Sequence, residues 1–187
     1  VMGGILARFI RFKRVSYERM LIRSMMAMGG GILVASVSFV LVPAGIKELS
    51  IIAFSLVFLA GVLTFQFLNK ILSRSGSSFV QVFAMLMDFI PESMALGASY
   101  LHDPKMALLL AVFIGLQNIP EGFNAYHELR RKHFSRLMIF GLLWACAVLG
   151  LVPAFIGHFF LRNSIDFIAM VMIFSSGGIL YLVFHDI

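Results

Sequence analysis

Two short segments of this chain carry a carboxylate directly after a proline, inside otherwise apolar sequence. They are Asp88-Phe89-Ile90-Pro91-Glu92-Ser93 and Gln117-Asn118-Ile119-Pro120-Glu121-Gly122. A charge in the middle of a membrane span is costly and usually functional, and a proline there opens the backbone beside it. The repetition of the pattern predicts that the two segments are the two halves of one polar site.

The spacing within each segment predicts how the polar side chains are presented. Asp88 and Glu92 are four residues apart, as are Gln117 and Glu121, so each pair lies on one helical face about one turn apart. A proline cannot donate to the carbonyl four residues before it, so each helix is expected to kink and to free a carbonyl oxygen. Two such helices side by side would present three carboxylates and one or two amides at similar depth.

Three carboxylates at one place in a low dielectric repel one another or become protonated. A bound divalent cation removes that problem, because it supplies the opposite charge, and it leaves again when the carboxylates take up protons. No Lys or Arg lies inside any expected span to act as a partner instead. A proton or sodium pathway would also use carboxylates, so these residues alone do not identify the ion.

The composition is that of an integral membrane protein. Hydrophobic residues make up 60% of the 187 residues and charged residues only 13%, and the mean hydropathy is +0.98. Too few polar residues remain to cover the surface of a water-soluble domain. The single cysteine, Cys146, excludes a disulfide framework.

The apolar runs predict an all-α, polytopic transmembrane bundle that forms a single domain over residues 1–187. The ten-residue alternation of β-barrel strands is absent. The stretch from Val1 to Phe9 is too short to cross a bilayer and is expected to be a partial first helix. Six full spans are expected, at about 24–46, 49–69, 78–101, 106–126, 137–161 and 166–186.

The basic residues predict the orientation of these spans. Alternate loops hold twelve of the 15 Lys and Arg residues, and the intervening loops hold only Lys47, Lys105 and Arg162. The basic loops are therefore expected to face the cytoplasm. This rule accounts for the net charge of +6 without nucleic-acid binding, because the basic loops contain no nucleic-acid-binding motif. The twelve residues are Arg8, Arg11, Lys13, Arg14, Arg19, Arg23, Lys70, Arg74, Arg130, Arg131, Lys132 and Arg136.

The paired motifs resemble those of the ZIP (Zrt-/Irt-like) family of divalent-metal transporters. The segment from Gln117 to Gly122 matches the family's second metal-binding motif throughout, and the segment from Asp88 to Ser93 matches the first at the proline and the glutamate. The run from Ser175 to Asp186 resembles the family's seventh helix, and the run from Gly29 to Pro43 resembles its second. The family has eight spans, so the resemblance implies a chain that lacks most of the first helix and all of the eighth.

The resemblance implies a pair of adjacent metal positions. Asp88 stands where histidine is common, which makes the first position all oxygen and leaves room for Mn²⁺, Fe²⁺ or Cd²⁺ beside Zn²⁺. Phe89 replaces a usual asparagine, which removes a ligand from the second position. Carried over, the first position uses Asp88, Glu92, Gln117 and Glu121, and the second uses Glu92, Asn118, Glu121 and Asp186.

The function expected on these grounds is divalent metal-ion transport, with zinc taken up into the cytoplasm as the substrate. The resemblance also implies a multi-pass protein of the plasma membrane (the inner membrane in a bacterium), alternating access and a homodimer. A proton- or sodium-coupled carrier of another solute, using the same carboxylates, is the alternative. An intramembrane enzyme is not expected, because the sequence contains neither His-Glu-x-x-His nor Gly-x-Gly-Asp.

Overall fold

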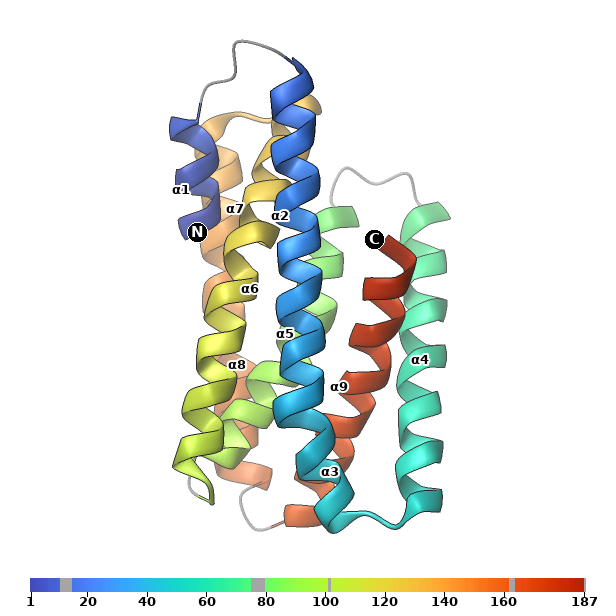
Figure 1. Cartoon of the computed structure of the whole chain (residues 1–187). Helices are drawn as coiled ribbons and strands as arrows, with labels where there is room; N and C mark the ends of the chain where they lie inside the picture. The colour runs from blue at the N-terminus through green and yellow to red at the C-terminus, as the bar shows by residue number, and fades with distance from the viewer. Residues whose placement is uncertain (11–14, 75–79, 101, 162–163, 187) are drawn as a thin grey trace.

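The computed structural model describes residues 1–10, 15–74, 80–100, 102–161 and 164–186, and within them all regular structure is helical. The long helices run side by side along one direction (Figure 1). In chain order the elements are α1 (Met2–Phe9), α2 (Val15–Ser36), η1 (Val37–Leu41), α3 (Val42–Glu48), α4 (Ile51–Arg74), α5 (Val80–Ser99), α6 (Pro104–Arg131), α7 (Arg136–Leu149), α8 (Leu151–Ile156), η2 (Gly157–Leu161) and α9 (Ile165–Asp186).

Two of the spans are composite helices that contain a π-helical segment. The first joins α2, η1 and α3, and the second joins α7, α8 and η2. Pro43 follows η1 by two residues, and Pro153 precedes η2. Proline removes one hydrogen bond from the helical ladder, and a π-helical turn is a common local adjustment to such an interruption.

Five helices of the described chain are long and apolar enough to cross a membrane. They extend over Ser16–Glu48, Ile51–Arg74, Pro104–Arg131, Arg136–Leu161 and Ile165–His185. The expected span at 78–101 is a helix as well, α5, but it is not among the five, and it carries Asp88 and Glu92. The short helix expected at the start is present as α1. The all-helical prediction is thus confirmed, while the number of spans stays a prediction.

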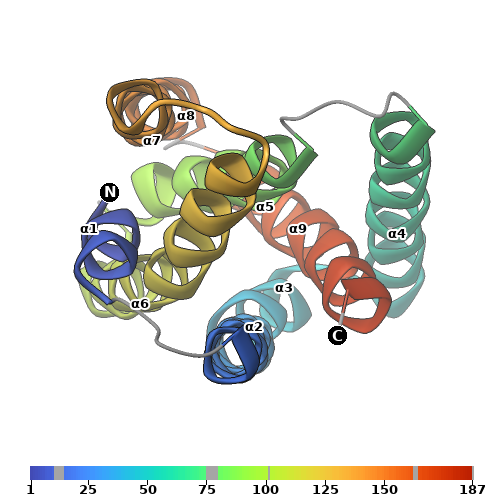
Figure 2. The same ribbon diagram turned by 90° about the horizontal axis from the view of Figure 1, so that it is seen from above.

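Helix α5 lies in the middle of the bundle. It contacts α6, α8, η2, α9 and α4, and Figure 2 shows it surrounded by these elements when the bundle is viewed along its length. Helix α6 lies between α1 and α2, and α9 lies along α4. The two helices that carry the predicted site, α5 and α6, are therefore neighbours.

Glycines bring two pairs of helices into backbone contact. A Cβ added to Gly61 of α4 would lie 2.0 Å from the carbonyl oxygen of Phe174, and one added to Gly177 of α9 would lie 2.1 Å from that of Phe58. The same reciprocal contact joins Gly97 of α5 to α8, and Gly157 of η2 to α5. Small residues allow this close approach between helices in a membrane.

The apolar core divides into two clusters, and the predicted polar residues lie between them. On α5, Met85 belongs to one cluster and Ala95 to the other, and Asp88 and Glu92 fall between. On α6, the members run to Ile114 in one cluster and resume at Phe123 in the other, and Gln117 and Glu121 fall between. Both helices therefore place their polar pair in the same layer of the bundle.

Candidate polar site between α5 and α6

Asp88, Glu92, Gln117 and Glu121 meet in this layer, as their spacing predicts. Asp88 is 4%, Glu92 0% and Gln117 1% exposed, and Glu121 is partly buried. Each of the three carboxyl groups is close enough to the other two for direct electrostatic interaction. The two proline motifs are thus two halves of one cluster, which we call the carboxylate cluster.

One side-chain hydrogen bond among the described residues joins α5 to α6 within the carboxylate cluster. The Gln117 amide Nε2 donates to Glu92 Oε2, and the carboxyl group of Glu121 lies near those of Asp88 and Glu92. Asp88 Oδ1 accepts the backbone N–H of Phe89 at 2.8 Å. Ionised carboxylates can only accept, so neighbouring carboxyl groups repel one another unless they hold protons or bind a cation.

Three buried oxygens of the carboxylate cluster have no hydrogen-bond partner among the described residues: Glu92 Oε1, Gln117 Oε1 and Glu121 Oε2. A buried polar atom without a partner costs free energy, so such atoms call for an explanation. All three are oxygens with lone pairs directed into a protein interior. A hard cation takes ligands of this kind.

The described ion pairs involve Glu18 and Glu128, not the three clustered carboxyl groups. Within the described residues, no three His, Cys, Asp or Glu side chains are already disposed around a common centre as a metal-binding group. Two of the carboxyl groups are engaged elsewhere, because Glu92 accepts from the Gln117 amide and Asp88 accepts from the Phe89 backbone. An ion would bind here by replacing these contacts.

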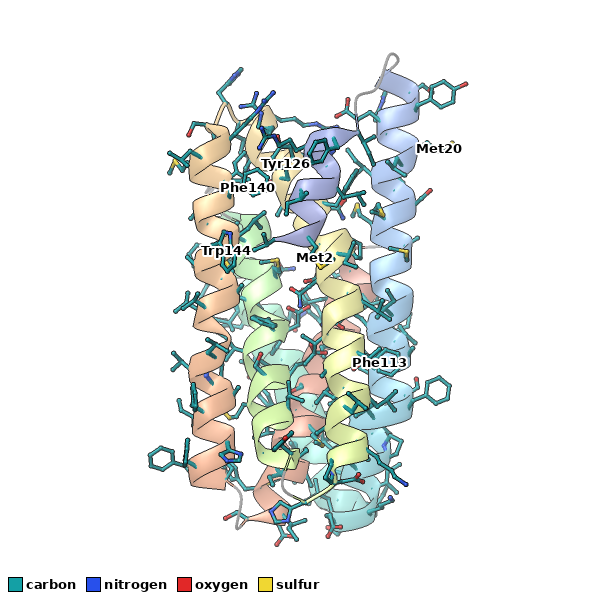
Figure 3. The ribbon with its side chains drawn as sticks, turned by 90° about the vertical axis from the view of Figure 1, so that its left-hand side faces the viewer. Met2, Met20, Phe113, Tyr126, Phe140 and Trp144 are labelled. Atoms are coloured by element: carbon teal, nitrogen blue, oxygen red, sulfur yellow. The ribbon has the colours of Figure 1, made fainter. Side chains whose placement is uncertain are left out.

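Asn118 lies on a different face of α6 from Gln117 and Glu121. Its Nδ2 donates to the Ile114 carbonyl at 2.7 Å, and its side chain lines a cavity of about 370 Å³ between α1, α5, α6 and α7. Phe89 lines the same cavity, and so do Met2 and Trp144, which lie at similar height on α1 and α7 (Figure 3). The structure therefore gathers four of the six predicted residues and leaves Asn118 in a neighbouring apolar cavity.

The sixth predicted residue, Asp186, is the last residue of α9, and its side chain lies outside the described part of the chain. Its neighbour His185 is described. The His185 Nδ1 lies 3.4 Å from Asn69 Nδ2 of α4, and the ring centroid lies 5.5 Å from that of Tyr181. This end of α9 is thus in contact with α4.

The glycine run of α2 supports the proline of α6. Gly29 is buried, and a Cβ added there would lie 3.1 Å from Pro120 Cγ. On the other side of α6, a Cβ added to Gly3 of α1 would lie 1.9 Å from the carbonyl oxygen of Ile119. Helices α1 and α2 therefore both pack closely on the turn of α6 that contains Pro120 and Glu121.

The candidate site residues expected from the sequence do not include Glu18, Asn124 or His127. The side chain of His127 is only 14% exposed, and its Nδ1 lies 3.6 Å from Glu18 Oε1 of α2. Asn124 Oδ1 is buried and has no hydrogen-bond partner among the described residues. The signal available on α6 was periodicity, because positions 121, 124 and 127 follow one another at intervals of three and are neighbours on a helix surface.

Neither a protein-family model nor a curated protein sequence matches this chain.

Proposed function

We propose that this chain is a divalent metal-ion transporter of the ZIP type, which carries zinc across the membrane into the cytoplasm. The proposal is supported above all by one observation. Asp88, Glu92, Gln117 and Glu121 meet in a buried layer between two proline-interrupted helices, and three of their oxygens have no hydrogen-bond partner among the described residues. Ionisable residues inside transmembrane segments mark ion pathways far more often than structural contacts.

The donor set suits a divalent ion. Glu92, Glu121 and Asp88 supply negative charge, and the Gln117 Oε1 supplies a neutral oxygen. Carboxylate and amide oxygens favour Zn²⁺ less exclusively than histidine or cysteine would, so Mn²⁺, Fe²⁺ and Cd²⁺ are expected to compete as substrates. The carboxylates compensate the free-energy cost of burying the ion, and the ion compensates the cost of burying the carboxylates as isolated charges in a low dielectric.

Binding is expected to exchange protons for the ion. Neighbouring carboxyl groups in a low dielectric retain protons, and those protons must leave before the groups can bind a cation. The prolines inside α5 and α6 also remove helical donors from the carbonyls of Met87 and Leu116, which are then available as further oxygen ligands. Freed backbone carbonyls are a common way for transporters to hold an ion in mid-membrane.

Zinc uptake into proteoliposomes tests this function directly. We expect Glu92→Gln and Glu121→Gln each to lower the initial uptake rate by more than about tenfold, because loss even of a residue that only orients a ligand costs roughly 10–100-fold in metal affinity. The matched control is Glu128→Gln, since Glu128 lies on the same helix but pairs with Lys132 at the surface. Zinc uptake by both cluster variants at the rate of the control would exclude the proposal.

The alternative is a proton- or sodium-coupled carrier of another solute, and it is favoured by three neighbouring carboxyl groups that form none of the described ion pairs. Calorimetric titration of the purified protein with Zn²⁺ separates the two functions. A zinc transporter shows saturable binding at the carboxylate cluster, and Glu92→Gln abolishes binding at that site. A protein that binds no divalent ion, yet acidifies vesicles through Glu121 when a pH gradient is imposed, is a proton-linked carrier instead.

A further inference from the structure

We propose a second cation site, formed by Glu18, Asn124 and His127, which receives the ion from the carboxylate cluster on its way to the basic end of the bundle. By the basic end we mean the end where α2 begins and α6 ends (Figure 1). The inference rests on the proposed function, because it supplies a step that the carboxylate cluster alone does not provide. The three residues come from α2 and α6, which are in contact along their length.

Helix α6 carries a polar line from the carboxylate cluster toward the basic end. Asn124 follows Glu121 by three residues and His127 follows Asn124 by three, so consecutive members are neighbours on the helix surface, with Cβ atoms about 5–6 Å apart. Asn124 Oδ1 and Glu121 Oε2 are both buried and both lack a hydrogen-bond partner among the described residues. An ion released by Glu121 therefore meets an amide oxygen one turn further along.

The separation of Glu18 and His127 fits a shared metal ion better than a hydrogen bond. The two facing atoms, His127 Nδ1 and Glu18 Oε1, are 3.6 Å apart, which is too long for a hydrogen bond. Two ligands at about 2.0–2.2 Å from a tetrahedral zinc ion lie roughly 3.4 Å apart. The observed spacing thus corresponds to the edge of a zinc coordination tetrahedron with little movement of either side chain.

Packing fixes the orientation of the imidazole. The ring of His127 lies against that of Phe123, with centroids 4.7 Å apart, and it meets the ring of Tyr126 edge to face at 5.9 Å. Tyr126 in turn contacts Phe140 of α7, and both lie at the basic end of the bundle (Figure 3). A histidine held by neighbouring rings presents its nitrogen in a defined direction, as a metal ligand must.

The contact of Arg131 with Glu18 makes ion binding at the second site transient. Its guanidinium lies 3.3 Å from the same Glu18 oxygen, and its side chain is 57% exposed. An arriving cation competes with Arg131 for Glu18, and the displaced guanidinium can move into water. When Arg131 returns, it expels the ion. The nearby pair of Glu128 and Lys132, 3.0 Å apart, is already neutral and does not take part.

The number of zinc ions bound to the purified protein in detergent tests this inference. Calorimetric titration with Zn²⁺ alone is expected to give two sites in the unaltered protein and one in the double variant Glu92→Gln/Glu121→Gln. Adding His127→Ala to the double variant should remove the remaining site. Adding His133→Ala should not, because this second histidine of the same region is exposed. If His127→Ala fails to fold, Glu18→Gln serves in its place.

Cobalt identifies the ligands. Co²⁺ bound to the double variant should show the strong visible absorption of a site with a low coordination number and a nitrogen ligand. Adding His127→Ala should remove this absorption. The double variant binding no zinc, while the unaltered protein binds one ion, would overturn the second site and leave the proposed function intact. Zinc binding that is lost with His127→Ala, yet unchanged in the double variant, would overturn the proposed function of the carboxylate cluster and leave the second site intact.

Discussion

The hydrogen bond between Gln117 and Glu92 predicts that removing either partner alone lowers the stability of the protein. Glu92 is fully buried, and its Oε1 already lacks a partner among the described residues. Replacing Gln117 with methionine, which has nearly the same shape, removes the donor to Oε2 and leaves both carboxyl oxygens without a partner. A buried group left in that state costs about 1–3 kcal/mol, and more if it is charged. The variant Gln117→Met should therefore be destabilised by at least that amount.

The partner variant and the double variant complete a thermodynamic cycle. Glu92→Met strands the Gln117 amide and should also cost about 1–3 kcal/mol, whereas the double variant removes both polar groups together. Replacing both members of a buried pair by apolar groups of similar shape is nearly neutral. We therefore expect the double variant to be more stable than either single variant, with a coupling free energy of about 2–6 kcal/mol, the sum of the two single effects.

Reversible unfolding in mixed micelles measures this cycle. A difference of about 1–3 kcal/mol changes the unfolding equilibrium constant roughly 5- to 150-fold, which is well within the range of a denaturation curve. Zinc binding at the carboxylate cluster should be lost in all three variants, whereas their stabilities should differ, so the stability and the function of the pair separate. The reasoning is refuted if the destabilisation in the double variant equals the sum of the two single effects, since the two side chains would then be energetically independent.

Two further predictions concern the carboxylate cluster and the helix contacts. Zinc binding should release protons from the carboxylate cluster and should tighten as the pH rises, because the bound state holds fewer protons. Calorimetry in two buffers of different ionisation enthalpy measures the release, and binding without any proton release would contradict it. Gly61→Ala should destabilise the bundle by about 1–3 kcal/mol, because the new methyl group would lie 2.0 Å from a carbonyl oxygen of α9. Gly141→Ala should stabilise it by about 0.5–1 kcal/mol, because a methyl group there meets nothing within 4 Å. Thermal unfolding compares the two variants, and equal effects on stability would contradict the packing.

The sequence was sufficient to predict the helices and the convergence of the two proline motifs. Long apolar runs cannot leave their backbone groups unpaired in a membrane, so they must be helical. Positions four apart on a helix share a face, so once α5 and α6 pack together Asp88, Glu92, Gln117 and Glu121 meet. Both predictions depend only on the local pattern of apolar and polar residues, which can be read from a single sequence.

The extent of the helices was harder to predict, because hydropathy does not mark where a helix ends. The span expected at 106–126 continues as helix α6 to Arg131. Its last turns are polar, and they are held by the pair of Glu128 and Lys132 and by the guanidinium of Arg130, which donates to the Phe134 carbonyl at 2.8 Å. Contacts of this kind support a helix after its apolar run has ended.

The helices that pack against each face of α6 could not be predicted from the sequence alone. Asn118 is adjacent to Gln117 in sequence, yet one residue is a rotation of about 100° on a helix, so the two point to different neighbours. Which neighbour each one meets depends on where α1, α2 and α7 pack. The same holds for His127, which is covered only because α2 lies against it and brings Glu18 within reach.

The charges of the carboxylate cluster determine how many protons one ion replaces. Residues 75–101 and 106–129 contain no Lys or Arg, so a buried cluster of three carboxyl groups is neutral only when all three carry protons. One divalent ion brings two positive charges against three negative ones, and neutrality is kept if two protons leave and one remains. The release is therefore expected to be about two protons per zinc ion. Asn118 and Phe89 add no charge from their separate cavity, so a second ion beside the first would require a further carboxylate, such as that of Asp186, to keep the layer neutral.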